Sequence, residues 1–259
     1  MTPRLSTLPN FRDVGGVATR DGAQVSTRKL YRSVSLDKLD DADRAALEGL
    51  GIGRVYDLRT TSEQSTSPDR LPGDARYMAL DVLADAQPDA PAQLQDVLID
   101  PRAAEGILAD GKAVTLFHQA YRDIVSLPSA LRGYRRFFTD LASPEAPAAL
   151  VHCATGKDRT GWASAALLTF LGVHESDVTQ EYLRSNTDLL PALKPLFDRF
   201  AEAGGDPDLL LPVLGVREEY LQTARREVEE RFGGIEGYFA DGLGLTEVER
   251  DRLRATFLE

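Results

Sequence analysis

The chain contains very little cysteine or histidine. Cys153 is the only cysteine among 259 residues, so no internal disulfide can form. Apart from His152, which precedes that cysteine, the histidines are His118 and His174, and they form no cluster typical of a metal site. We therefore expect no disulfide, no metal and no other cofactor. A lone cysteine ordinarily packs as a small apolar residue, and a chemical role for Cys153 must be argued from its surroundings.

Long apolar runs are also missing. The longest nearly apolar stretch, residues 163–173, is shorter than the roughly 18 residues that cross a bilayer. The first ten residues lack the continuous apolar core of an export signal. These features predict no membrane insertion and a cytoplasmic location, and they leave open secretion by a route without such a signal.

Positive charge is in deficit, because the formal net charge is −11. At long range this charge repels polyanions, which argues against binding of nucleic acid or of an acidic membrane by the surface as a whole. An anionic substrate would therefore need a local positive site. The composition says nothing about the oligomeric state.

The order of the predicted elements indicates an α/β protein. At 42% apolar residues the chain is ordinary for a globular protein, and its length suits a single domain, residues 1–259. Helix-like and strand-like patterns alternate in the first two thirds, and the last third is helical. We predict strands over residues 54–58, 76–82 and 148–151, and helices over residues 36–50, 160–171, 188–203, 217–232 and 246–258, with two more within 115–141 separated at Pro128. Residues 81–101 are predicted to form a mobile surface loop.

The segment between the strand at 148–151 and the helix at 160–171 carries the chemistry. Five residues separate Cys153 from Arg159, which is enough only for a tight loop. Such a loop can wrap its backbone N–H groups around one tetrahedral anion, at which the following helix points its positive end. The predicted phosphate-binding residues are Ala154, Thr155, Gly156, Lys157, Asp158 and Arg159.

The same field favours ionisation of Cys153, because a thiol beside a helix N-terminus and cations loses its proton easily. A thiolate attacks phosphorus without a separate base. Arg159 offers a planar fork that pairs with two phosphoryl oxygens. Thr160 can place a hydroxyl near the sulfur and stabilise it as a leaving thiolate, and His152 is predicted to orient the loop through its ring nitrogens.

These residues carry a family resemblance. Residues 152–161, His-Cys-Ala-Thr-Gly-Lys-Asp-Arg-Thr-Gly, resemble the HCxxGKxRTG signature of an atypical bacterial branch of the protein tyrosine phosphatase superfamily. Further segments similar to that branch span nearly the whole chain: 10–16, 30–33, 57–59, 182–186 and 214–220. The resemblance implies a three-layer α/β fold with a central, mainly parallel sheet flanked by helices. It also implies a phosphatase that acts on phosphoproteins, tyrosine above all, through a phosphocysteine intermediate.

Two other functions stay open. A phosphoinositide phosphatase would use the same residues, and the resemblance associates Lys157 with that activity in related enzymes. The ordinary alternative for Lys157 is a surface lysine paired with Asp158. A non-catalytic phosphate-binding module is disfavoured because both Cys153 and Arg159 are retained.

The general acid has two candidates. Asp81 follows a predicted strand and begins the predicted mobile loop, from which it could close over substrate. Asp158 lies in the phosphate loop and could reach the leaving group or simply pair with Lys157 or a neighbouring arginine. The usual Trp-Pro-Asp acid loop is absent, and we favour Asp81 slightly.

Other positions are predicted to support the site. The resemblance suggests that Asn10, Arg12 and Asp13 brace the loop, with Arg12 paired to Asp13 or Asp57. Arg32, Asp57 and Arg59 are expected to form a charged layer around it. Residues 187–214 are rich in leucine, proline and phenylalanine; the resemblance suggests a mobile helical lid, and a helical pair packed on the core is the alternative.

Overall fold

The computed structural model describes residues 3, 5–86, 101–143 and 146–259, and its centre is a five-stranded sheet. The strands are β1 Arg12–Asp13, β2 Leu30–Ser33, β3 Ile52–Asp57, β4 Arg76–Ala79 and β5 Ala148–His152. Their order is β1-β2-β5-β3-β4, and only β1 runs antiparallel to its neighbour. The predicted α/β fold with a mainly parallel sheet is therefore confirmed.

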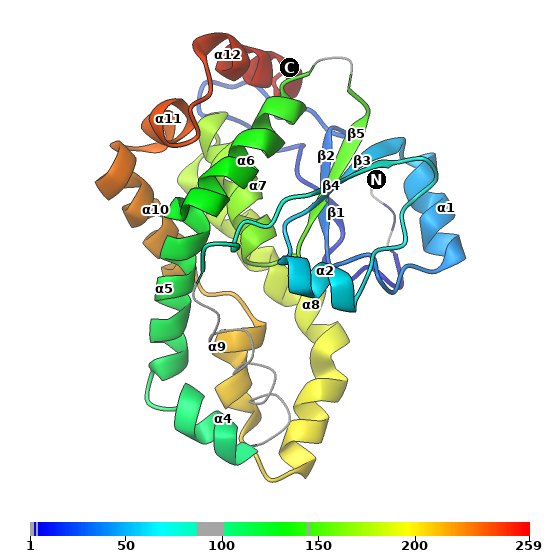
Figure 1. Cartoon of the computed structure of the whole chain (residues 1–259), viewed down its shortest axis with the longest axis vertical. Helices are drawn as coiled ribbons and strands as arrows, with labels where there is room; N and C mark the ends of the chain where they lie inside the picture. Colours follow the sequence, from blue (N-terminus) through cyan, green and yellow to red (C-terminus); the bar gives the residue numbers. More distant parts are fainter. Residues whose placement is uncertain (1–2, 4, 87–100, 144–145) are drawn as a thin grey trace.

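Each face of the sheet is covered by a core of its own. Successive strand residues point to opposite faces, so Val55 and Leu150 pack with the helix α1 (Asp41–Gly49), whereas Tyr56 and Val151 pack on the other side. That second side carries α6 (Pro128–Leu141) and α7 (Arg159–Phe170) (Figure 1). The sheet thus lies between two helical layers.

The remaining helices extend these layers. Thr61–Thr66 forms the short α2 after β3. Further helices contribute to the core on the side of α6 and α7, and they are α5 Lys112–Ser126, α8 Glu175–Glu202, α10 Glu218–Phe232, α11 Ile235–Gly237, η2 Tyr238–Gly242 and α12 Glu247–Phe257. No helix in the described part of the chain is both long and apolar enough to cross a membrane.

Several predicted boundaries need correction. The helix predicted from residue 36 begins at Asp41, because the Asp40 side chain caps it by accepting from the Asp43 N–H. The helix predicted from residue 188 begins at Glu175, where Val178, Tyr182, Ser185 and Leu189 are buried at helical spacing. Strands β1 and β2 were not predicted from the sequence. Of the predicted mobile loop, residues 87–100 lie outside the described part of the chain.

A third apolar cluster lies away from the sheet. It joins α4 (Pro101–Leu108), the start of α5, the second half of α8, η1 (Pro207–Leu210) and α9 (Leu211–Leu214), with Phe200 and Leu210 buried in it. Figure 1 shows these elements as an extension below the sheet. Most of residues 187–214 belong to this extension.

Candidate active site

The loop from Cys153 to Asp158 joins the end of β5 to the start of α7. Gly156 has a φ of +66°, and a Cβ atom there would lie 2.1 Å from the Ser33 carbonyl oxygen. Only glycine permits both this backbone conformation and the close approach to β2. The loop is therefore pressed tightly against the end of the neighbouring strand.

The outer side of this loop is held by its carbonyl groups. The Asn10 side-chain amide donates to the carbonyls of Thr155 (3.2 Å) and Gly156 (3.0 Å), and Arg32 donates to Gly156 at 2.7 Å. The Ala154 carbonyl accepts from the Ser35 N–H at 3.1 Å. In a trans peptide the next N–H points away from the carbonyl, so three consecutive N–H groups, those of residues 155–157, point away from these donors. This is the arrangement that binds an anion on the inner side.

Two buried arginines behind the loop share one carboxylate from α8. Glu181 accepts from Arg12 Nε and from Arg32 Nη1, each at 2.7 Å. Arg12 also contacts the side chain of Asn10, which binds the loop. The predicted partners of Arg12, Asp13 and Asp57, are wrong. Glu181 is brought to Arg12 by a helix far away in the sequence, and the Asp13 carboxylate instead accepts backbone N–H groups of residues 15 and 28.

Removing the Glu181 charge is expected to destabilise the protein strongly. Glu181→Gln replaces the carboxylate that both buried guanidinium groups share by a neutral amide, and it leaves Arg12 a longer contact of 3.6 Å to Asp188. Removing one partner of a buried ion pair typically costs about 3–5 kcal/mol in unfolding free energy. The matched control is Glu175→Gln on the same helix, since Glu175 is 76% exposed in its pair with Arg225 and such a pair contributes about 0–1 kcal/mol. Urea unfolding of both variants measures the difference, and equal losses would contradict the assignment.

The loss of unfolding free energy in Glu181→Gln should also depend on pH. Burial opposes ionisation of Glu181, but Arg32 and Arg12 outweigh it and lower the pKa of this carboxyl. A lowered folded-state pKa contributes stability above the unfolded-state pKa of about 4.3, and that contribution disappears as pH falls through the folded-state value. The difference between Glu181→Gln and the parent protein should therefore be largest near neutral pH and shrink in acid.

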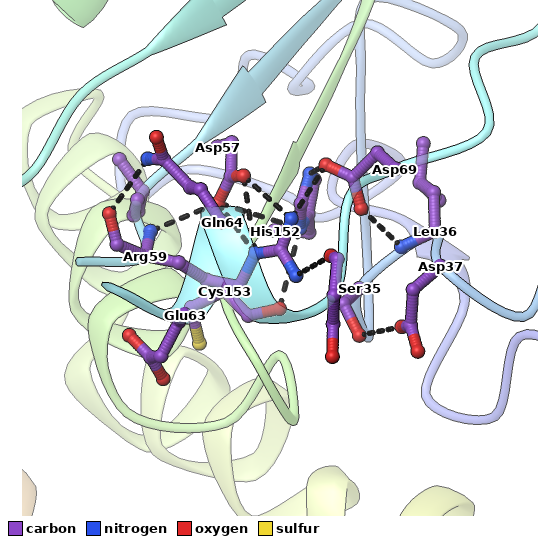
Figure 2. Close-up of polar contacts among 12 residues, drawn as sticks. Ser35, Leu36, Asp37, Asp57, Arg59, Glu63, Gln64, Asp69, His152 and Cys153 are labelled. Atoms are coloured by element: carbon purple, nitrogen blue, oxygen red, sulfur yellow. Dashed lines mark hydrogen bonds and ion pairs between the residues drawn. The ribbon is translucent and has the colours of Figure 1, made fainter. Parts of the chain in front are cut away.

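A second charged group lies beside Cys153 (Figure 2). His152 places Nε2 3.1 Å from a carboxylate oxygen of Asp69 and Nδ1 3.2 Å from the Cys153 carbonyl oxygen. Arg59 donates to Asp57 and lies 2.9 Å from Asp69. Asp57, Asp69 and His152 are close enough together to share a cation, and the guanidinium of Arg59 supplies that positive charge. The network joins β3, β5 and the Asp69 segment around the base of the loop.

Burial would raise the pKa of Asp57, but a hydrogen bond from Arg59, then the electrostatic interaction with His152 and a hydrogen bond from Tyr77, lower it. The carboxylate is therefore ionised at neutral pH. The expected charged layer of Arg32, Asp57 and Arg59 is thus present around the loop.

Arg159 is held by a residue that the sequence argument missed. Its Nη1 and Nη2 donate to the two carboxylate oxygens of Glu63 at 2.6 and 2.8 Å. Burial alone would lower the pKa of Arg159, but Glu63 and the nearby Cys153 raise it above its ordinary value. Arg159 is therefore a permanent cation next to the sulfur. Cys153 itself is 1% exposed, and Thr160 has a buried hydroxyl with no hydrogen-bond partner among the described residues.

A sequence signal for Glu63 did exist. Thr60 and Glu63 form a capping box at the start of α2, in which each side chain binds the other residue's N–H. The pattern Thr-x-x-Glu after a strand predicts such a helix start. It does not predict that the same carboxylate also binds Arg159, because the two residues are far apart in the chain.

The two acid candidates have different surroundings. Asp81 accepts from the N–H (2.9 Å) and hydroxyl (3.2 Å) of Thr61, and from the N–H of Leu83 at 3.1 Å. Asp158 accepts from Lys157 at 2.7 and 2.8 Å and from the Tyr121 hydroxyl at 2.8 Å. The pairing expected for a surface lysine is thus present, but Lys157 is buried, with a side chain 4% exposed.

Comparison with known proteins decides the family. A family model described as "Tyrosine phosphatase family" matches residues 3–259. The chain belongs to the tyrosine phosphatase family. It is 32% identical to the "Triple specificity protein phosphatase PtpB" of Mycobacterium tuberculosis, over 96% of both chains. It is also 32% identical to a putative tyrosine-protein phosphatase of Cupriavidus necator, over 97% of this chain and 86% of that one.

A tyrosine-protein phosphatase of Nostoc commune is 28% identical, over 86% of this chain and 72% of its own. Membership of the tyrosine phosphatase family makes the chain a phosphatase, as the resemblance implied. The family match extends over the N-terminal bracing residues and the C-terminal helices as well as the loop.

Proposed function

We propose that the protein hydrolyses phosphomonoesters, phosphotyrosine in proteins above all, with Cys153 as the nucleophile. The observation that carries this proposal is the loop whose carbonyls are bound from outside by Asn10, Arg32 and the Ser35 N–H. This leaves its N–H groups for an anion beside the cysteine and Arg159. The relatives are named as protein phosphatases, which supports phosphoprotein substrates.

The reaction has two displacements. The Cys153 thiolate forms an S–P bond while the ester P–O bond breaks, and the leaving oxygen takes a proton from an acid. Water then attacks the phosphorus and returns a proton to the acid residue, the S–P bond breaks, and phosphate leaves. Arg159 and the loop N–H groups stabilise the charge on the transferred group in both steps. The Thr160 hydroxyl, which has no hydrogen-bond partner in the described part of the chain, is available to the leaving thiolate.

A phosphoinositide phosphatase with the same site is the second candidate. The lysine within the loop, which the family resemblance associates with this activity, favours it. Initial rates on a singly phosphorylated tyrosine peptide and on short-chain phosphoinositides, compared as kcat/KM, separate the two. A higher kcat/KM on the lipids would reverse our preference.

We propose Asp81 as the general acid. The Asp158 carboxylate is ion-paired with Lys157, whereas Asp81 lies at the protein surface and accepts from uncharged groups of Thr61 and Leu83. Thr61 begins α2 and lies two residues before Glu63. Asp81→Asn is expected to reduce kcat about 100-fold or more on an alkyl phosphate, which needs a proton on its leaving oxygen. On p-nitrophenyl phosphate, a good leaving group, the loss should be much smaller.

Asp158→Asn is the matched comparison for this test. The acid must be protonated to act, so its removal should also abolish the fall in kcat at high pH. If Asp158→Asn shows both effects and Asp81→Asn shows neither, the roles are exchanged.

We also propose that residues 187–214 act as a lid. Their side chains bury themselves in the third apolar cluster rather than in the sheet cores, apart from Leu189 and Leu193. Amide hydrogen exchange should then be faster in this segment than in β3 and β5. If residues 187–214 were as protected from exchange as β3 and β5, the lid would be excluded and the segment would be a helical pair packed on the core.

A further inference from the structure

Lys157 is a cation of the phosphate loop that is enclosed by its neighbours. Its ammonium donates to both oxygens of Asp158, and Nζ lies 4.7 Å from the centroid of the Phe117 ring. An ammonium has three N–H donors, and here two bind the carboxylate while the third is left for the ring face. Lys157 therefore has no donor left for a substrate in this conformation.

The enclosing groups come from one face of α5 and are fixed in turn. Tyr121, one helical turn after Phe117, donates to Asp158, and its hydroxyl lies 2.6 Å from that of Tyr182. The Phe117 ring stacks on Tyr220 with centroids 5.1 Å apart. Burial, and then Asp158, raises the pKa of Tyr121, so this hydroxyl keeps the proton it donates. The enclosure of Lys157 is thus a built arrangement of three helices.

The enclosure has a consequence for substrates. One phosphate is satisfied by the loop N–H groups and Arg159. A second phosphate on the same substrate needs a further cation. Lys157 belongs to the loop itself, and its flexible four-carbon stem can bring the ammonium to a group beside the bound phosphate once it is released. Release of the Lys157 ammonium breaks its contact with Phe117 and replaces its hydrogen bonds to Asp158 by hydrogen bonds to the substrate anion.

We propose that Phe117 is a specificity-determining residue: by holding Lys157 it favours substrates with a single phosphate over substrates with a second phosphate next to the scissile one. This inference rests on the proposed function. Phe117 acts through Lys157 and is a positioning residue. Its effect should lie in KM for the doubly phosphorylated substrate, because the ammonium binds a non-reacting group in ground state and transition state alike.

The test compares kcat/KM for inositol bisphosphate and inositol monophosphate, and for peptides with phosphotyrosine alone or next to phosphothreonine. Phe117→Leu keeps an apolar side chain but removes the ring face. It should raise the ratio of doubly to singly phosphorylated substrate about three- to tenfold, through KM, as expected for the loss of one cation–π contact. Turnover of the singly phosphorylated substrates should change little. If this ratio rises for the inositol phosphates alone, or for the peptides alone, the result identifies which source of the second phosphate the site accepts.

Two further variants separate this effect from simple loosening of the fold. Phe117→Tyr retains the ring face and should keep the parent ratio. In a Lys157→Met background, Phe117→Leu should change no ratio, because no ammonium is left to release. An unchanged ratio in Phe117→Leu, or the same rise in the Lys157→Met background, overturns the proposal. If the parent protein itself turned over none of these substrates, that result would instead contradict the proposed function.

Discussion

Cys153→Ser is expected to lower turnover by about 10⁵-fold or more, the scale on which loss of a nucleophile acts in other hydrolases. The reason is specific to this site. Cys153 lies next to the permanent cation of Arg159 and the backbone N–H groups of its own loop, and no hydrogen bond to its sulfur is found among the described residues. A thiolate needs no base, whereas a serine hydroxyl stays protonated in the same field. The substitution preserves size, so the loop should keep its shape.

The measurement is phosphate release, with two accompanying readouts. Rapid acid quench of the parent protein with labelled substrate should trap label on Cys153, and Cys153→Ser should trap none. Thermal unfolding, and competition by inorganic phosphate for binding of a labelled phosphopeptide, report whether the loop is intact. Undiminished turnover in Cys153→Ser would falsify the thiolate mechanism.

Much of this site could be predicted from the sequence because its central part is local. Cys153 and Arg159 lie in one strand–loop–helix unit, where spacing alone dictates a tight turn around an anion. The parallel sheet follows for a similar reason, since strand and helix patterns alternate along the chain. The carboxylates could not be predicted in the same way. Glu63 and Glu181 come from α2 and α8, and no local pattern pairs a carboxylate with an arginine that is 96 or 169 residues away.

The errors at helix ends have a related cause. The α8 helix contains Pro191 and Pro195, and each removes a backbone donor and crowds the preceding turn. Local propensity therefore argues against one long helix. Leu189 and Phe200, on either side of the prolines, are buried in different apolar clusters, and their packing stabilises the continuous helix. This contribution becomes visible only in three dimensions.

Arg159→Lys is expected to lower kcat about 100- to 1000-fold with a smaller change in KM, because the fork acts mainly on the transition state. The contact with Glu63 explains the demand for arginine. Glu63 binds the edge formed by Nη1 and Nη2. The other edge, formed by Nε and the remaining N–H of Nη2, has no acceptor among the described residues and can take two phosphoryl oxygens. A lysine is a point charge that cannot serve a carboxylate and a phosphate with separate edges.

Glu63→Gln tests this division of the guanidinium. Burial opposes ionisation of Glu63, yet hydrogen bonds from Arg159 lower the pKa of this carboxyl, so the pair is charged throughout the neutral range. Glutamine keeps the cap of α2 but holds one nitrogen of Arg159 rather than two, and kcat should fall about tenfold. In the double variant with Arg159→Lys the Glu63 substitution should cost little more, because the fork that it positions is already gone. If the two losses multiply in full, Glu63 acts independently of Arg159, and the carboxylate has some role other than orienting the guanidinium.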